Sequence, residues 1–214
     1  MKKLYIFDFD GTLINSIEDS MMCFNKVLKS FDLPQYEVDD YDNLVYGDFR
    51  NFLNSLIDNY DDNNTLWNKL IRNFVEVYHN DEKPNTCVYN GIYELLNKLV
   101  KKGIDLAICS NKESFILNDL INKYFSSYNF SMISGSVEGI PDKPNPYRLN
   151  KIVEKLDYNK KDILYIGDKD TDIEVAKNAG LDIAFVTWGQ STKKDFESDY
   201  PLKYVNDPHE LLDF

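Results

Sequence analysis

Apolar residues follow two patterns along this chain, and the change between them divides it. From residue 15 to about residue 80, apolar positions recur at steps of three and four, which is the spacing of one face of an α-helix. This spacing predicts helices over residues 17–31, 49–57 and 65–78. A polar stretch that contains Pro84 follows, and such a stretch is typical of a linker.

After the linker, short apolar runs alternate with helical spacing. Together with an apolar run near the N-terminus, they predict five strands, at residues 4–7, 104–109, 130–133, 162–166 and 183–186. Strands that alternate with helices form a doubly wound parallel, Rossmann-like sheet. We therefore expect an α/β fold with a core domain of residues 1–14 and 85–214, and an inserted helical domain of residues 15–84.

Composition narrows the class of protein. The 214 residues carry a net charge of −12, which argues against binding to nucleic acid or to an anionic membrane surface, because both need clusters of Lys and Arg. The three cysteines have no C-x-x-C spacing, so reduced thiols in a cytoplasmic protein are the simplest expectation. No stretch approaches the roughly 18 uncharged apolar residues of a membrane-spanning helix.

Two carboxylates follow the first predicted strand, at Asp8 and Asp10, and a glycine turn comes directly after them. Alternate residues of an extended chain point the same way, so both carboxylates can face one crevice. Like charges this close are stabilised by a shared proton or a divalent cation. A solvated acidic turn is the alternative, whereas an EF-hand loop is excluded, because Leu13 and Asp19 stand where that loop needs Gly and Glu.

Other polar residues follow later strands of the predicted sheet. Ser110 and Asn111 end one strand, and Asp168 ends another after Gly167. Ligands of open α/β sheets bind outside the carboxyl ends of the strands, so these residues should share a crevice with Asp8. Asp172, at the start of the next helix, can turn toward the same place, although an acidic helix start is also favoured by the helix dipole.

At the amino ends of their strands, Asp105 and Asp182 should be solvated. Lys143 lies in a loop with three prolines. Most lysines are simply solvated, but a stiff loop lowers the entropic cost of holding an ammonium group in place.

Four segments together resemble the haloacid dehalogenase superfamily, in its phosphoglycolate-phosphatase-like and β-phosphoglucomutase-like branch. They are the run Asp8–Leu13, the triplet Ser110–Lys112, Lys143 in its Lys-Pro-x-Pro setting, and Gly167-Asp168 with Asp172. Their order matches the family over essentially the whole chain. The resemblance implies that the inserted helical domain is a mobile cap.

The resemblance also implies a phosphatase mechanism. Asp8 would attack the substrate phosphorus and form an aspartyl-phosphate, while Asp10 would serve as acid and then base. Mg²⁺ would be held by Asp8, the main-chain carbonyl of Asp10, and Asp168, with Asp172 in support. Oxygen ligands suit that ion and disfavour zinc.

By the same resemblance, Ser110, Asn111 and Lys143 would bind the phosphoryl group. The expected partner is a small phosphorylated metabolite, without nucleic acid or membrane, and the protein is expected to be a monomer or a weak homodimer. Gly47 and Arg50 are the candidates for substrate contacts from the cap, and the loop 188–190 is expected to border the site.

Related functions remain as alternatives. A hexose-phosphate mutase of this branch typically has Glu-Asp in place of Gly167-Asp168, and a pyrophosphatase or a nucleotidase is a more distant alternative. A dehalogenase lacks an acid at the position of Asp10. A receiver-like signalling domain, which accepts a phosphate without turnover, is smaller and has no cap. Phosphoglycolate, a nucleoside monophosphate, pyrophosphate and a sugar phosphate are all compatible with the sequence.

Overall fold

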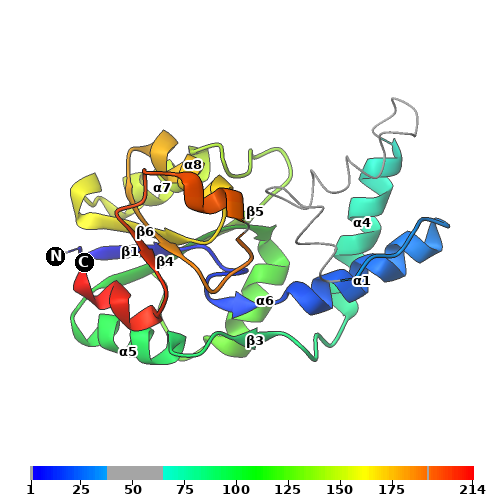
Figure 1. The fold of residues 1–214 in the computed structure, drawn as a ribbon, viewed down its shortest axis with the longest axis horizontal. Coiled ribbons are helices and arrows are strands. Elements are labelled where there is room, and N and C mark those ends of the chain that lie inside the picture. Colours follow the sequence, from blue (N-terminus) through cyan, green and yellow to red (C-terminus); the bar gives the residue numbers. More distant parts are fainter. Residues whose placement is uncertain (1, 38–64, 192) are drawn as a thin grey trace. The chain divides into compact units, whose positions relative to one another are not determined.

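The structure is a computed structural model that describes residues 2–37, 65–191 and 193–214. Its contacts divide the chain into two compact units. One combines Met1–Asn15 with Val88–Phe214, and the other is Ser16–Cys87. Figure 1 shows the sheet of the first unit and the helices of the second.

Six strands form the main sheet, in the order β5-β4-β1-β6-β7-β8, and every neighbouring pair is parallel. Their bounds are β1 (Leu4–Phe7), β4 (Asp105–Glu113), β5 (Met132–Ser136), β6 (Ile163–Gly167), β7 (Asp182–Val186) and β8 (Lys203–Val205). The doubly wound parallel sheet is confirmed, but the expected number of five strands is wrong. The additional strand, β8, has three residues and begins with an exposed lysine, so it leaves no apolar run in the sequence.

The central strand is β1, which pairs with β4 on one side and β6 on the other. All four of its residues are fully buried. A strand covered on both faces reads as a continuous apolar run, as Leu4–Phe7 does. Each large apolar side chain buried in this way contributes roughly 1.5–3 kcal/mol to stability.

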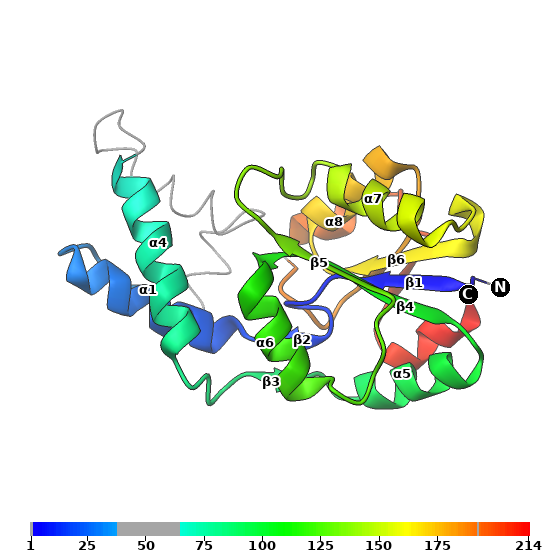
Figure 2. The same ribbon diagram turned by 180° about the vertical axis from the view of Figure 1, so that it is seen from behind.

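Helices cover both faces of the sheet. Figures 1 and 2 show α7 and α8 on one face and α5 and α6 on the other. Their bounds are α5 (Ile92–Lys101), α6 (Ser114–Tyr124), α7 (Tyr147–Leu156) and α8 (Asp170–Ala179), and three short 3₁₀ helices lie at Lys160–Asp162, Lys193–Glu197 and Pro208–Asp213. The fold therefore leaves the carboxyl ends of the strands, rather than the faces of the sheet, for polar chemistry.

In the second unit, α1 (Ile17–Ser30) packs against α4 (Thr65–Asn80). Their apolar faces meet around Phe24 and Leu70, and the rings of Phe24 and Phe74 make an edge contact at 6.1 Å. The helices predicted at 17–31 and 65–78 are thus confirmed. The helix predicted at 49–57 lies outside the described residues.

The return linker is anchored within this unit. The buried carboxylate of Asp19 on α1 accepts hydrogen bonds from the side-chain amide of Asn85 (2.9 Å) and the hydroxyl of Thr86 (2.6 Å). Two short strands, β2 (Ile14–Asn15) and β3 (Cys87–Val88), pair with each other.

No helix in the part of the chain that the structure describes is long and apolar enough to cross a membrane.

Candidate active site

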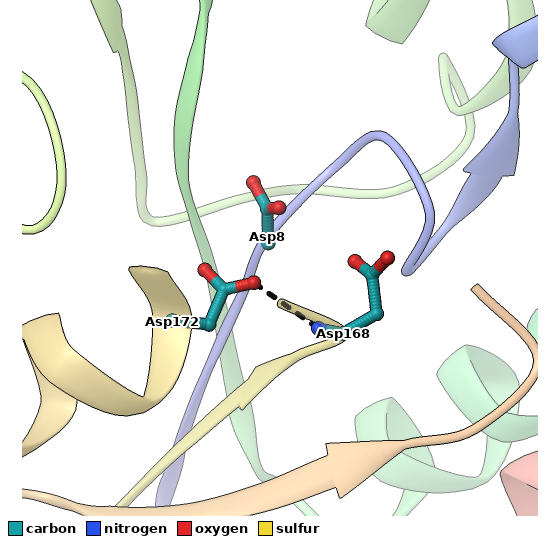
Figure 3. A group of neighbouring side chains, drawn as sticks. All are labelled: Asp8, Asp168 and Asp172. Atoms are coloured by element: carbon teal, nitrogen blue, oxygen red, sulfur yellow. Dashed lines mark hydrogen bonds between the residues drawn. The ribbon is translucent and has the colours of Figure 1, made fainter. Parts of the chain in front are cut away.

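Three aspartates meet at the carboxyl ends of β1 and β6. One carboxylate oxygen from each of Asp8, Asp168 and Asp172 lies within 4.8 Å of the others, and all three residues are buried. Figure 3 shows that Asp8 follows β1, Asp168 follows β6, and Asp172 comes from the first turn of α8. Because β1 and β6 are paired parallel strands, the residues that follow them in the sequence lie close together at the same edge of the sheet.

Two donors orient the carboxylate of Asp168. The hydroxyl of Thr12 donates a hydrogen bond to Asp168 Oδ1 (3.0 Å), and the main-chain N–H of Gln190 donates one to Oδ2 (2.7 Å). Burial raises the pKa of Asp168 to about 8, and the negative charges of Asp172 and Asp8 add to the shift. The carboxylate is therefore held in place but is costly to ionise unless a cation binds beside it.

Two glycines allow this close packing around Asp168. Gly11 has a φ of +82°, which favours glycine, and a Cβ at that position would overlap Asp168 Oδ2. A Cβ at Gly189 would overlap the same oxygen and the main-chain oxygen of Gly11. The turn at Gly11 was expected, and the loop 188–190 was expected to border the site. The hydrogen bond from Gln190 could not be read from the sequence, because any residue type can donate it.

A buried lysine neutralises part of the cluster. Lys143 Nζ lies 2.8 Å from Asp8 Oδ1 and 2.7 Å from Asp172 Oδ1, with the hydroxyl of Tyr165 at 3.2 Å. Burial acts to lower the pKa of Lys143, but Asp172 and Asp8 outweigh it and the pKa lies above its ordinary value. Lys143 is thus a charged component of the site and not a solvated surface lysine.

The same environment acts on Asp8. Burial raises the pKa of Asp8 to about 6, although the nearby charge of Lys143 acts to lower it. Asp8 Oδ1 forms the ion pair with Lys143 but accepts no well-directed hydrogen bond from any residue that the structure describes. An under-coordinated buried carboxylate oxygen fits a group that must meet a cation or a substrate.

Asp172 supports the other two carboxylates. Its Oδ1 accepts hydrogen bonds from Lys143 and from the hydroxyl of Tyr165 (2.8 Å). Its Oδ2 accepts from the main-chain N–H groups of Asp168 and Lys169, both at 3.1 Å, and Figure 3 shows the first of these. Oδ2 therefore fixes the turn that carries Asp168, while Oδ1 holds Lys143 and Tyr165.

Asp10 lies outside this cluster. Its side chain is 23% exposed, compared with 10% for Asp8, and it forms an ion pair with Lys112 at 3.1 Å. The two carboxylates of the same turn thus have different surroundings. Sequence reasoning treated Lys112 only as part of the Ser110–Lys112 triplet and missed its pairing with Asp10.

Ser110 and Asn111 lie at the end of β4, beside the Lys143 loop. Ser110 is 2% exposed, and its hydroxyl accepts a hydrogen bond from the N–H of Lys112 (3.2 Å). The side chain of Asn111 accepts from the N–H of Lys143 (2.9 Å) and donates to the carbonyl of Lys143 (3.1 Å). The side-chain amide of Asn111 is therefore used to hold the lysine loop, which sequence reasoning did not foresee.

The donor set fits a magnesium ion. The clustered carboxylates supply the oxygen ligands that magnesium prefers. Zinc, a softer ion, prefers histidine and cysteine, and the cluster contains neither. Two of the three carboxylates have pKa values raised by burial, and a bound cation would relieve that cost. The candidate substrate contacts Gly47 and Arg50 lie outside the described residues.

Comparisons with known proteins show which family the chain resembles. A family model described as haloacid dehalogenase-like hydrolase matches residues 5–186. A phosphoglycolate phosphatase of Aquifex aeolicus is 29% identical over 211 residues, which cover 99% of this chain and 97% of that protein. A phosphoglycolate phosphatase of Vibrio vulnificus is 27% identical over 218 residues, with 99% and 95% covered.

Solved structures share the fold. A haloacid dehalogenase-like family hydrolase of Streptococcus pneumoniae superposes with a TM-score of 0.86 at 17% identity, covering 99% of this chain and 97% of the other. At that level of identity the similarity establishes the fold of the chain.

Proposed function

Because this chain belongs to the haloacid dehalogenase-like hydrolase family, we propose that it is a Mg²⁺-dependent phosphatase that hydrolyses a small phosphomonoester through an aspartyl-phosphate. The observation that carries the proposal is the buried cluster of Asp8, Asp168 and Asp172 beside the ammonium group of Lys143. A phosphoryl group has several negatively charged oxygens, and such a site offers the ammonium group of Lys143, and a metal ion when one is bound, to hold them and a carboxylate to attack the phosphorus.

Asp8 is the proposed nucleophile. Attack by one of its oxygens forms a bond to phosphorus and breaks the bond to the leaving oxygen, and water then hydrolyses the acyl phosphate. The ion pair with Lys143 favours the ionised form of Asp8 that this step requires, against the burial that raises its pKa. Asp8 is buried, so attack is shielded from bulk water.

Asp10 is the proposed acid and base. It would protonate the leaving oxygen and then accept a proton from the attacking water. Its side chain lies outside the carboxylate cluster, and its pairing with Lys112 holds it at the edge of the site. The division of roles between Asp8 and Asp10 is supported by this difference in surroundings.

Lys143 and Ser110 are the proposed phosphate-binding side chains, and Asn111 contributes by fixing the main chain of Lys143. Mg²⁺ would be held by Asp8, the main-chain carbonyl of Asp10, and Asp168, with Asp172 in support. When bound, that ion would neutralise charge on the phosphoryl oxygens.

Phosphoglycolate is the proposed type of substrate, since the curated relatives at 27–29% identity are named for that activity. A mutase is less well supported, because the glutamate typical of mutases would stand at Gly167, where a Cβ would overlap Asp172. The helical segment of residues 15–84 is proposed to be the cap that selects the substrate, through Gly47 and Arg50. A cytoplasmic location is part of the proposal.

A phosphate-release assay tests this function. We expect hydrolysis of phosphoglycolate, measured beside a nucleoside monophosphate, pyrophosphate and a hexose phosphate, to require Mg²⁺ and to stop with a chelator. Asp8→Asn should lower turnover by at least about 10⁴-fold while the protein stays folded by circular dichroism. Hydroxylamine added during turnover should convert Asp8 to a hydroxamate that is detected by mass spectrometry of the peptide.

Asp105→Asn is the matched control, because Asp105 is an exposed aspartate at the amino end of β4. Its turnover should equal that of the unsubstituted protein. Substantial phosphate release by purified Asp8→Asn would overturn the assignment of the nucleophile. Conversion of a hexose 1-phosphate to its 6-phosphate, faster than phosphate release, would favour the mutase.

A further inference from the structure

Arg148, in the first turn of α7, is a buried arginine that no part of the proposed mechanism uses. It is 4% exposed, and every N–H of its guanidinium group donates a hydrogen bond. Nε donates to the carbonyl of Pro141 (3.4 Å), and Nη1 donates to the carbonyls of Ser110 and Ser134. Nη2 donates to Asn111 Oδ1 (2.5 Å) and to Asp142 Oδ1 (2.8 Å).

These acceptors belong to different segments of the chain. Ser110 and Asn111 lie near the end of β4, Ser134 lies in β5, and Pro141 and Asp142 lie in the loop that leads to Lys143. One side chain therefore joins the segment that carries Ser110 to the loop that carries Lys143.

A continuous chain of contacts runs from Arg148 to the proposed nucleophile. Asn111 Oδ1 receives one hydrogen bond from Arg148 and another from the N–H of Lys143 (2.9 Å). Lys143 in turn places Nζ 2.8 Å from Asp8. Arg148 also donates to the carbonyl of Ser110, so it contacts the main chain of Ser110 directly and the main chain of Lys143 through Asn111.

We propose that Arg148 is a positioning residue for phosphate binding, which sets the distance between Ser110 and Lys143 without touching the substrate. This inference rests on the proposed phosphatase function. The planar guanidinium group suits the task, because its fixed fork meets five acceptors, whereas a lysine has three donors on a flexible stem. Displacement of a binding group by about 1 Å lowers rates by up to about 10²-fold.

The test measures binding of inorganic phosphate in the presence of Mg²⁺ by titration calorimetry. Arg148→Lys keeps the charge but loses the fork, so we expect its phosphate affinity to be weaker by about tenfold. Asp142→Asn removes one charged acceptor of Arg148 and should weaken phosphate binding by about threefold. Mg²⁺ binding without phosphate should be unchanged in Arg148→Lys, because none of the clustered carboxylates contacts Arg148. With the best substrate of the release assay, Arg148→Lys should show a raised KM as well as a lowered kcat.

Lys151→Met is the matched control, since Lys151 lies on the same helix in an exposed pair with Glu154. Its phosphate affinity should stay within about twofold of the unsubstituted value. If Arg148→Lys lowers thermal stability but binds phosphate as tightly as the unsubstituted protein, Arg148 is merely structural and the inference is overturned. If the unsubstituted protein itself binds no phosphate, the proposed function fails and this inference fails with it.

Discussion

Aspartates stand at both ends of the parallel strands, but the two ends surround them differently. At the carboxyl ends, Asp8 and Asp168 are buried in one carboxylate cluster, and Asp8 forms an ion pair with Lys143. At the amino ends, Asp105 is exposed and Asp182 pairs with Lys2 while its side chain remains 45% exposed. The expectation of a solvated carboxylate is therefore confirmed for Asp105, whereas Asp182 is only partly exposed because it pairs with Lys2.

The pKa values differ in the same way. Burial raises the pKa of Asp168 to about 8, whereas a hydrogen bond from Lys3 lowers the pKa of Asp162 at the amino end of the sheet. One residue type thus becomes hard to ionise at one end and easy to ionise at the other. The contrast teaches that dense packing around the carboxylates, more than their number, separates a reactive edge from a solvated one.

The largest loss of stability should come from removing Lys143, the buried cation that pairs with both Asp8 and Asp172. Lys143→Met leaves Asp8 and Asp172 without their ion-pair partner, so we expect the free energy of unfolding to fall by about 3 kcal/mol, together with loss of phosphate binding. Urea denaturation measures the change.

The double variant Lys143→Met/Asp172→Asn sharpens this prediction. It removes one of the two uncompensated charges and should recover part of the lost stability without restoring phosphate binding. A stability of Lys143→Met equal to that of the unsubstituted protein would contradict the view that the buried carboxylates depend on this lysine.

An intermediate effect should appear in the pH dependence of stabilisation by Mg²⁺. The raised pKa values of Asp8, about 6, and Asp168, about 8, mean that the metal-free folded protein keeps protons that the unfolded chain loses near pH 4. Its stability therefore falls as the pH rises from about 4 to 8. Mg²⁺ replaces those protons, so the rise in Tm at a fixed Mg²⁺ concentration should be larger at pH 8 than at pH 5.5.

Thermal denaturation at the two pH values, with and without Mg²⁺, measures this difference. Asp168→Asn is the control, and its Tm should respond weakly to Mg²⁺ at both values. A Mg²⁺-induced shift of equal size at pH 5.5 and pH 8 in the unsubstituted protein would argue against proton release on metal binding.

The smallest effect should come from the amino end. Asp162→Asn removes the ion pair with Lys3 (2.9 Å), in which the lysine side chain is 64% exposed and the aspartate side chain 16% exposed. We expect the free energy of unfolding to change by no more than about 0.5 kcal/mol, because an ion pair with a solvated lysine contributes little. Turnover should be unchanged. A loss as large as that of Lys143→Met would remove the distinction between the two ends.

Much of this site followed from sequence order alone. The residues that follow parallel strands lie at one edge of the sheet, so the predicted strands already bring Asp8, Ser110 and Asp168 together. Asp172 followed from its place at the start of a helix. These predictions depend on where the strands lie in the sequence, and short apolar runs predict the positions of most strands correctly.

What the sequence did not reveal are the residues that hold the site together. Arg148 occupies a helix position that would normally be solvated, and Tyr165 lies within an apolar strand and resembles core. The hydrogen bonds from Thr12 and Gln190 to Asp168 join residues far apart in the chain. Such contacts depend on side-chain packing in three dimensions, which spacing along the sequence does not record.

The central position of β1 also bears on how the protein is made. Its neighbours begin at Asp105 and Ile163, so the apolar segment Leu4–Phe7 emerges from the ribosome long before either partner exists. Contacts between α1 and α4 are nearer in sequence and can form in the meantime. An incomplete chain that ends before residue 163 leaves one edge of β1 without a partner, and an unpaired apolar edge is a template for aggregation. The strand that presents the proposed nucleophile is thus a segment that needs protection during synthesis.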